Sequence, residues 1–163
     1  MNPFSAHTAE IRRLVALWEP MLLALPADVL TTRFNSQYRT IKMILGHLCD
    51  SATNNTHRIV HLQYQPIPLH FPDYANLGNN DRWIRLQDYQ HSPWPDLVSL
   101  FTSTTLHFAH VADHVDESKL SNVWLNALAE PITLEEMIRD YGRHLGLHLG
   151  EIEDLINWNN CDC

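Results

Sequence analysis

The chain has 163 residues, of which 45% are hydrophobic and 18% charged, and its formal net charge is −8. This length favours a single domain spanning residues 1–163, and the composition is typical of a globular chain rather than a disordered one. The acidic balance argues against a nucleic-acid partner, because neutralising phosphates takes clustered Lys and Arg.

No apolar stretch approaches the roughly 20 residues of a membrane span, so no membrane association is expected. Residues 1–7 lack the basic and apolar regions of a signal peptide. Three cysteines (Cys49, Cys161 and Cys163) have no disulfide-framework spacing, which indicates a reducing compartment. We therefore expect a cytoplasmic protein, with residues 159–163 as a frayed tail.

The first helix is predicted from Ser5, as N-cap, to about Ala24. Pro20 lies inside this run, where a proline can kink a helix, and Pro26 closes it. A second helix is predicted from about Ser36 to Tyr64. Apolar residues at helical spacing give the expected core positions, which are Ile11, Leu14, Val15, Leu17, Trp18, Met21 and Leu22 in the first helix and Ile41, Ile44, Leu45, Leu48, Ala52, Ile59 and Leu62 in the second.

Residues 65–80 contain three prolines and then Gly78-Asn79-Asn80, which predicts a long loop of the kind that is usually functional or irregular. A short helical piece is expected over 81–89. Ser92-Pro93-Trp94-Pro95 marks the start of a third helix that runs to about Val115. Its expected core positions are Leu97, Leu100, Phe101, Leu106, Phe108 and Val111.

A second connection, with Trp124 and Pro131, leads to a capping box of Thr133 and Glu136. A fourth helix is predicted from there to about Trp158, and no stretch indicates an extended sheet. Four amphipathic helices, with long connections after the second and the third, predict an all-α four-helix bundle.

The chain has eleven histidines, and three pairs are spaced by one helical turn, namely His57/His61, His110/His114 and His144/His148. This spacing places two imidazoles on one face, roughly 6 Å apart along the axis, which suits two ligands of one divalent metal ion. With so many histidines, one or two such pairs arise by chance. Surface or core imidazoles are therefore the commoner interpretation of any single pair.

The surroundings distinguish the pairs. Arg58 and Gln63 beside the first pair indicate a solvated helix end, and the second pair, joined by His107, precedes acidic residues typical of an exposed end. The third pair lies among leucines.

Three glycines, Gly142, Gly146 and Gly150, are also interleaved with the third pair. Each glycine costs on the order of 1 kcal/mol in a helix, so something is expected to approach closely there. Tight helix packing is the alternative. His47 has a similar apolar context, so His47, His144 and His148 would converge if the second and fourth helices are neighbours.

Leu45-Gly46-His47-Leu48-Cys49-Asp50-Ser51 and the segment from His144 to Ile152 resemble DinB/YfiT-like proteins. The resemblance spans essentially the whole chain, including the Pro-rich stretch 65–74 and Asp81-Arg82-Trp83. It implies a four-helix bundle, often a homodimer, that holds Zn²⁺ or Ni²⁺ on three histidines, here His47, His144 and His148. Relatives often carry further histidines where this chain has Leu145 and Leu147.

Three neutral imidazoles would leave a metal ion its full charge and an open position, as in catalytic zinc sites. Water bound there is acidified, and a bound thiol is deprotonated. By resemblance, the first hypothesis is a low-molecular-weight-thiol S-transferase, with a small thiol and an electrophilic or xenobiotic compound as its partners. The alternatives are a metal-dependent hydrolase and a non-catalytic metal-binding bundle.

Candidate catalytic or orienting groups are Asp50, which shares the helix face of His47 together with Asn54, and Tyr141, three residues before His144. An ordinary exposed carboxylate is an equal interpretation of Asp50. Cys49 lies about 200° round the helix from His47 and is expected in the core. Cations for a thiol's carboxylates are scarce, and the sequence offers Arg82, Arg85 and Arg143.

Overall fold

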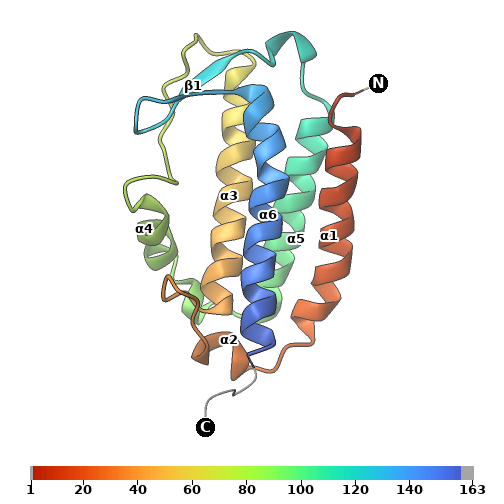
Figure 1. Ribbon diagram of the computed structural model, residues 1–163, viewed down its shortest axis with the longest axis vertical. Coiled ribbons are helices and arrows are strands. Elements are labelled where there is room, and N and C mark those ends of the chain that lie inside the picture. The colour runs from red at the N-terminus through yellow and green to blue at the C-terminus, as the bar shows by residue number, and fades with distance from the viewer. Residues whose placement is uncertain (1, 159–163) are drawn as a thin grey trace.

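Four long helices dominate residues 2–158, the part of the chain that the computed structural model describes (Figure 1). They are α1 (Ser5–Leu23), α3 (Ile41–Leu62), α5 (Trp94–Asp113) and α6 (Leu134–Ile156). Both α3 and α1 pack against α5 and α6. The predicted four-helix bundle is therefore confirmed. None of the described helices has the length and apolarity needed to cross a membrane.

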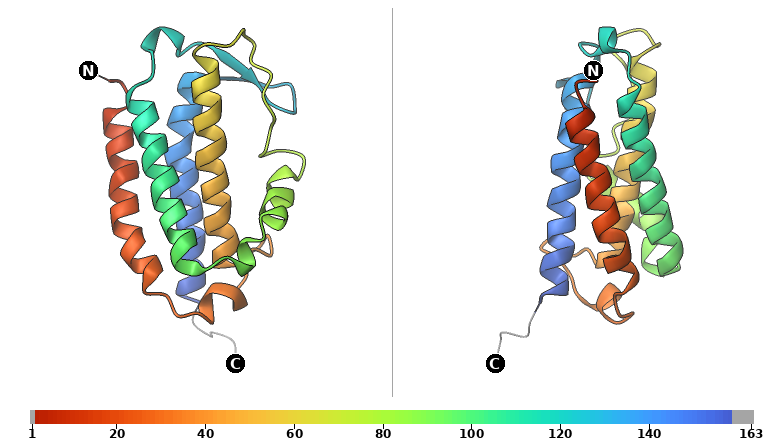
Figure 2. Two further views of the ribbon diagram at one scale, coloured as in Figure 1. Left: turned by 180° about the vertical axis from the view of Figure 1, so that it is seen from behind. Right: turned by 90° about the vertical axis from the view of Figure 1, so that its right-hand side faces the viewer.

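The order of the helices explains the first long connection. Helices α1 and α6 run in one direction and α3 and α5 in the other, so the neighbours α3 and α5 are parallel (Figures 1 and 2). A chain that joins parallel helices must return along the bundle. Residues 63–93 do so, and they carry α4 (Asn79–Leu86) and the 3₁₀ turn η1 (Tyr89–His91), which both contact α3.

The second helix begins later than predicted. Thr40 is the N-cap of α3, and its hydroxyl accepts a hydrogen bond from the Met43 amide. The predicted start at Ser36 is wrong because the Asn35 side chain accepts the amides of Gln37 and Arg39 and so closes a turn there. A short helix before this turn, α2 (Val29–Thr32), was not predicted.

The second connection contains a small sheet where no strand was expected. After the 3₁₀ turn η2 (Glu117–Lys119), β1 (Val123–Leu125) pairs antiparallel with β2 (Pro131–Thr133), and Leu69 of the first connection bridges to Trp124. Three-residue strands are too short to show a periodic pattern, so no spacing of apolar residues predicts them. The capping box of Thr133 and Glu136 is confirmed.

The core follows the predicted apolar pattern in α3, where all seven expected positions are buried. In α1 and α5 the apolar face is wider than the buried stripe, so four expected core residues are exposed, with Leu17 at 49%; the others are Met21, Leu100 and Leu106. Cys49 is buried in the core as predicted, and the expected tail 159–163, with Cys161 and Cys163, lies outside the described residues.

Candidate metal centre

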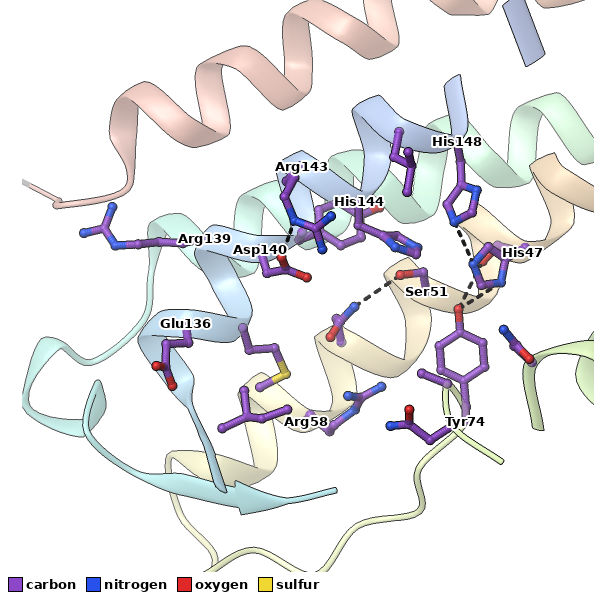
Figure 3. Close-up of a pocket in the computed structure, with 18 of the residues that line it drawn as sticks. His47, Ser51, Arg58, Tyr74, Glu136, Arg139, Asp140, Arg143, His144 and His148 are labelled. Carbon is purple, nitrogen blue, oxygen red and sulfur yellow. Dashed lines mark hydrogen bonds and ion pairs between the residues drawn. The ribbon is translucent and has the colours of Figure 1, made fainter. Parts of the chain in front are cut away.

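Three buried or half-buried histidines from two helices meet at one point (Figure 3). His47 comes from α3, and His144 and His148 come one turn apart from the antiparallel α6. One ring nitrogen of each lies within 4.8 Å of one nitrogen of the other two. The structure therefore brings together all three of the residues that the sequence proposed as metal ligands.

The geometry of the cluster fits a divalent ion. Nε2 of His47 lies 3.1 Å from Nε2 of His148. Two nitrogens bound to a tetrahedral zinc ion at about 2.0–2.1 Å would lie about 3.3 Å apart. In addition, Nε2 of His144 is buried without a hydrogen-bond partner in the described part of the chain. A metal ion at the centre would give this nitrogen the partner it lacks.

The electrostatics of the cluster also favour metal binding. Burial, reinforced by repulsion from neighbouring imidazoles, lowers the pKa of His47 to about 2. The same two causes lower the pKa of His144 to about 4. Both rings are therefore neutral at pH 7, which is the protonation state that a histidine needs to bind a metal ion.

Two further residues fix the orientation of the rings. The Tyr74 hydroxyl is hydrogen-bonded to Nδ1 of His47 at 3.2 Å, and Glu151 accepts a hydrogen bond from Nδ1 of His148 at 2.9 Å. Asn35 holds the same Glu151 oxygen at 3.1 Å. Metal-binding histidines are usually held in this way through their second nitrogen. The Nε2 atoms of both rings thereby face each other at the centre of the cluster.

Sequence reasoning missed both orienting residues. Glu151 follows His148 by three residues on one helix face, so its position was a readable signal. Tyr74 comes from the long connection after α3, where no helical spacing relates it to His47.

Asp50, a predicted catalytic candidate, points toward the first connection. It is buried, and its Oδ1 accepts hydrogen bonds of 2.6 Å from the Tyr89 hydroxyl and from the Gln87 amide. Burial raises the pKa of its carboxyl to about 6. The interpretation of Asp50 as an ordinary exposed carboxylate is wrong. Asn54, predicted beside it, donates to the Asp50 backbone carbonyl.

Tyr141, the other catalytic candidate, lines the pocket beside the histidines but directs its hydroxyl into the bundle. That hydroxyl donates to Thr105 of α5 at 3.5 Å, and its ring stacks on Phe108 with 3.8 Å between centroids. Burial raises the pKa of Tyr141, so the phenol is protonated at pH 7.

The glycines near the third pair do not share one role. A Cβ on Gly142 would lie 2.7 Å from the His7 ring, so this position does need close approach. Gly146 and Gly150 have open space beside them, and the expected close contact is wrong for both. The tightest position is Gly46 beside His47, where a Cβ would lie 2.1 Å from the Tyr89 ring.

The cluster lies in a cavity of about 890 Å³ whose walls come from α3, α6 and the two long connections. Of the three arginines proposed as a cationic group, only Arg143 lines it. Three others line it instead: Arg39, Arg58 and Arg139.

The other histidine pairs form no comparable group within residues 2–158. His57, His110 and His114 are exposed, as expected. The expectation of a solvated surface is wrong at Arg58, whose side chain is buried.

Comparison with known proteins gives the fold. No family model matches the chain, and no curated protein sequence matches it. Its structure is similar to that of YfiT from Bacillus subtilis, with a TM-score of 0.79 and 17% identity over 93% of this chain and 86% of that one. YfiT is described as a probable metal-dependent hydrolase with an unusual four-helix bundle topology. The chain therefore has the four-helix-bundle fold of YfiT, as the DinB/YfiT-like motifs implied.

Proposed function

We propose that this protein is a metal-dependent enzyme whose ion, Zn²⁺ or Ni²⁺, is held by His47, His144 and His148. The observation that carries the proposal is the convergence of these imidazoles in a cavity, where Nε2 of His144 is buried and has no hydrogen-bond partner among residues 2–158. An ion held by these three residues would supply a nucleophile, because water bound to it would have a lowered pKa and a thiol bound to it would lose its proton. Tyr74 and Glu151 hold the imidazoles in place.

The hydrogen bonds of the carboxylates in the cavity support a thiol as the nucleophile. Metal-bound water would be acidified only toward neutrality and commonly attacks with help from a nearby carboxylate as general base, whereas a metal-bound thiol would be fully deprotonated without one. The carboxylates lining the cavity are engaged: Glu151 with His148 and Asn35, Asp140 with Arg143, and Glu136 in the capping box. We therefore propose a low-molecular-weight-thiol S-transferase acting on electrophilic compounds. The thiol would release its proton to solvent, and its sulfur would then form a bond to carbon as the leaving group departs with its electron pair.

A metal-dependent hydrolase is the second candidate, and the likeness to YfiT favours it. In this case the same three histidines would serve, and activated water would replace the thiol as nucleophile. The homodimer and the cytoplasmic location that the resemblance and the cysteines suggested stay predictions.

Metal analysis of protein purified without an affinity tag tests the site. We expect one Zn²⁺ or Ni²⁺ per chain in the wild type and none in His148→Ala. His114→Ala is the matched control, since His110 and His114 have the same one-turn spacing but an exposed position. A wild type without a stoichiometric ion, or a His148→Ala variant with unchanged metal content, would show that the site is wrongly assigned.

A conjugation assay separates the two activities. Monochlorobimane should be conjugated to bacillithiol, glutathione or coenzyme A only when both metal and thiol are present. Turnover of an ester or amide without any thiol would instead establish the hydrolase and reject the transferase.

A further inference from the structure

Arg58 carries a buried positive charge with little to balance it. Arg58 is 4% exposed, and its Nε is buried without a hydrogen-bond partner in the described part of the chain. The ion pairs found within residues 2–158 do not include it. Burial lowers its pKa to about 10, so the guanidinium is still protonated at pH 7.

Two neighbours compensate this charge only in part. The guanidinium carbon lies 4.2 Å from the centroid of the Trp124 ring, in a cation–π contact. Asp73 attracts Arg58 electrostatically, but its carboxylate accepts hydrogen bonds from Asn76 and from the Ala75 and Ala127 amides. A buried charge without a close partner is strongly unfavourable, so its retention calls for a ligand or for another function.

The other arginines of the cavity differ from Arg58 in this respect. Each forms an ion pair with a neighbouring carboxylate, and the pairs are Arg39–Asp81, Arg139–Glu135 and Arg143–Asp140. Arg58 is therefore the arginine of this cavity whose charge is available to a bound molecule.

The position of Arg58 relates it to the histidine cluster. It follows His47 by eleven residues on α3, which is three helical turns and about 20°, so both lie on one face, about 16 Å apart along the axis. Ser51 and Asn55, between them on this face, also line the cavity. Helical side chains lean toward the N-terminus of their helix, which for Arg58 is the direction of His47. Figure 3 shows Arg58 in the same pocket as the histidines but set apart from them.

We propose that Arg58 binds an anionic group, a carboxylate or a phosphate, on the small molecule that reacts at the histidine cluster. The planar guanidinium suits two-point binding of either anion. The ligand would be elongated, with its anionic group several bonds from the reacting atom. This assignment rests on the proposed function for the role of the cluster, but anion binding at Arg58 requires neither metal nor turnover.

The test is a titration of metal-free, ¹⁵N-labelled protein with sodium malonate and, separately, with inorganic phosphate. Ionic strength is held constant with sodium chloride. The reporter is the indole N–H of Trp124, which stacks on Arg58 and donates to the Phe71 carbonyl. Its signal is assigned by Trp124→Phe.

In the wild type we expect at least one of the two anions to give a saturable shift. In Arg58→Gln the apparent affinity should fall at least tenfold, whereas Arg143→Gln, which removes an exposed and paired arginine of the same cavity, should keep it. If Arg58→Gln fails to fold, Arg58→Lys decides. It keeps the charge without the planar fork and should bind several-fold more weakly.

Three results would overturn the proposal. The first is a shift in Arg58→Gln, or in Arg58→Lys, that saturates at the same anion concentration as in the wild type. The second is an equal loss in Arg58→Gln and Arg143→Gln, which would reflect the overall charge of the cavity. The third is a linear shift in every protein, which would reflect bulk ions alone. A failure of the metal site would appear in the metal content, which is measured separately, and not in this titration of metal-free protein.

Discussion

Removal of the Glu151 carboxylate should weaken metal binding without unfolding the protein. Its oxygen accepts a hydrogen bond from Nδ1 of His148 at 2.9 Å and fixes the ring that presents Nε2 to the cluster. The side chain is partly exposed, at 26%, so its loss leaves no large cavity in the core. Because the contact acts on one ligand alone, we expect the effect to appear in metal affinity rather than in stability.

The expected size follows from the geometry. Losing a group that orients a metal-binding histidine weakens binding by about 10-fold to 100-fold, which corresponds to about 1.4 to 2.7 kcal/mol. Glu151→Gln keeps an oxygen that can accept from Nδ1 and removes only the charge, so its loss of affinity should be about 10-fold. Glu151→Ala removes both the acceptor and the charge, so its loss of affinity should be about 100-fold.

The assay is competition for Zn²⁺ between the protein and a chromophoric chelator of known affinity. Glu153→Ala is the matched control, because Glu153 lies two residues further along the same helix and is exposed. If Glu151→Ala held zinc as tightly as the wild type and the control, then the carboxylate would not orient His148, and the account of the ring positions would be wrong.

Two further predictions concern stability, measured by urea unfolding of the metal-free protein. Gly46→Ala should lower the free energy of unfolding by roughly 1–3 kcal/mol, because the new Cβ would meet the Tyr89 ring. Gly146→Ala should raise it by about 1 kcal/mol, because this helical position has open space beside it. Equal effects of the two substitutions would refute the packing described. Burial raises the pKa of Asp50 from 3.8 to about 6, so the folded state binds the proton more tightly than the unfolded state does. Relative to Asp50→Asn, the wild type should therefore lose up to about 3 kcal/mol of stability as the pH rises from about 4 to about 6, and its stability should change little above that pH. A stability that rises over this pH range would exclude a buried carboxyl.

Much of the bundle was predictable because helices carry periodic signals. The spacing of apolar residues located all four long helices, and the Thr133–Glu136 pair marked the start of α6 within one residue. The errors fall where interactions distant in sequence decide the structure. Strand β1, for example, is paired with β2 on one side and bridged to Leu69, more than fifty residues earlier, on the other.

The site divides in the same way. Helical spacing placed His144 and His148 on one face, and the apolar context of His47 completed the group that the structure brings together. Tyr74 reaches His47 from the long connection, which runs back along α3 because α3 and α5 are parallel. The packing order of the helices, rather than any local pattern, determined that this connection would cover the cluster.

Arg58 shows how this packing order changes the meaning of a residue. Beside His57 and His61, near the end of an isolated helix, an arginine indicates a solvated surface. Here the small sheet of the second connection places Trp124 over it, and the first connection adds Asp73 nearby, so the same side chain becomes buried in the wall of the cavity. The two long connections thus convert one face of α3 into a pocket that holds both the histidine cluster and, about three helical turns further along α3, a cation. The position of that cation is the reason for proposing an anionic substrate, and the titration of the Arg58 variants tests it.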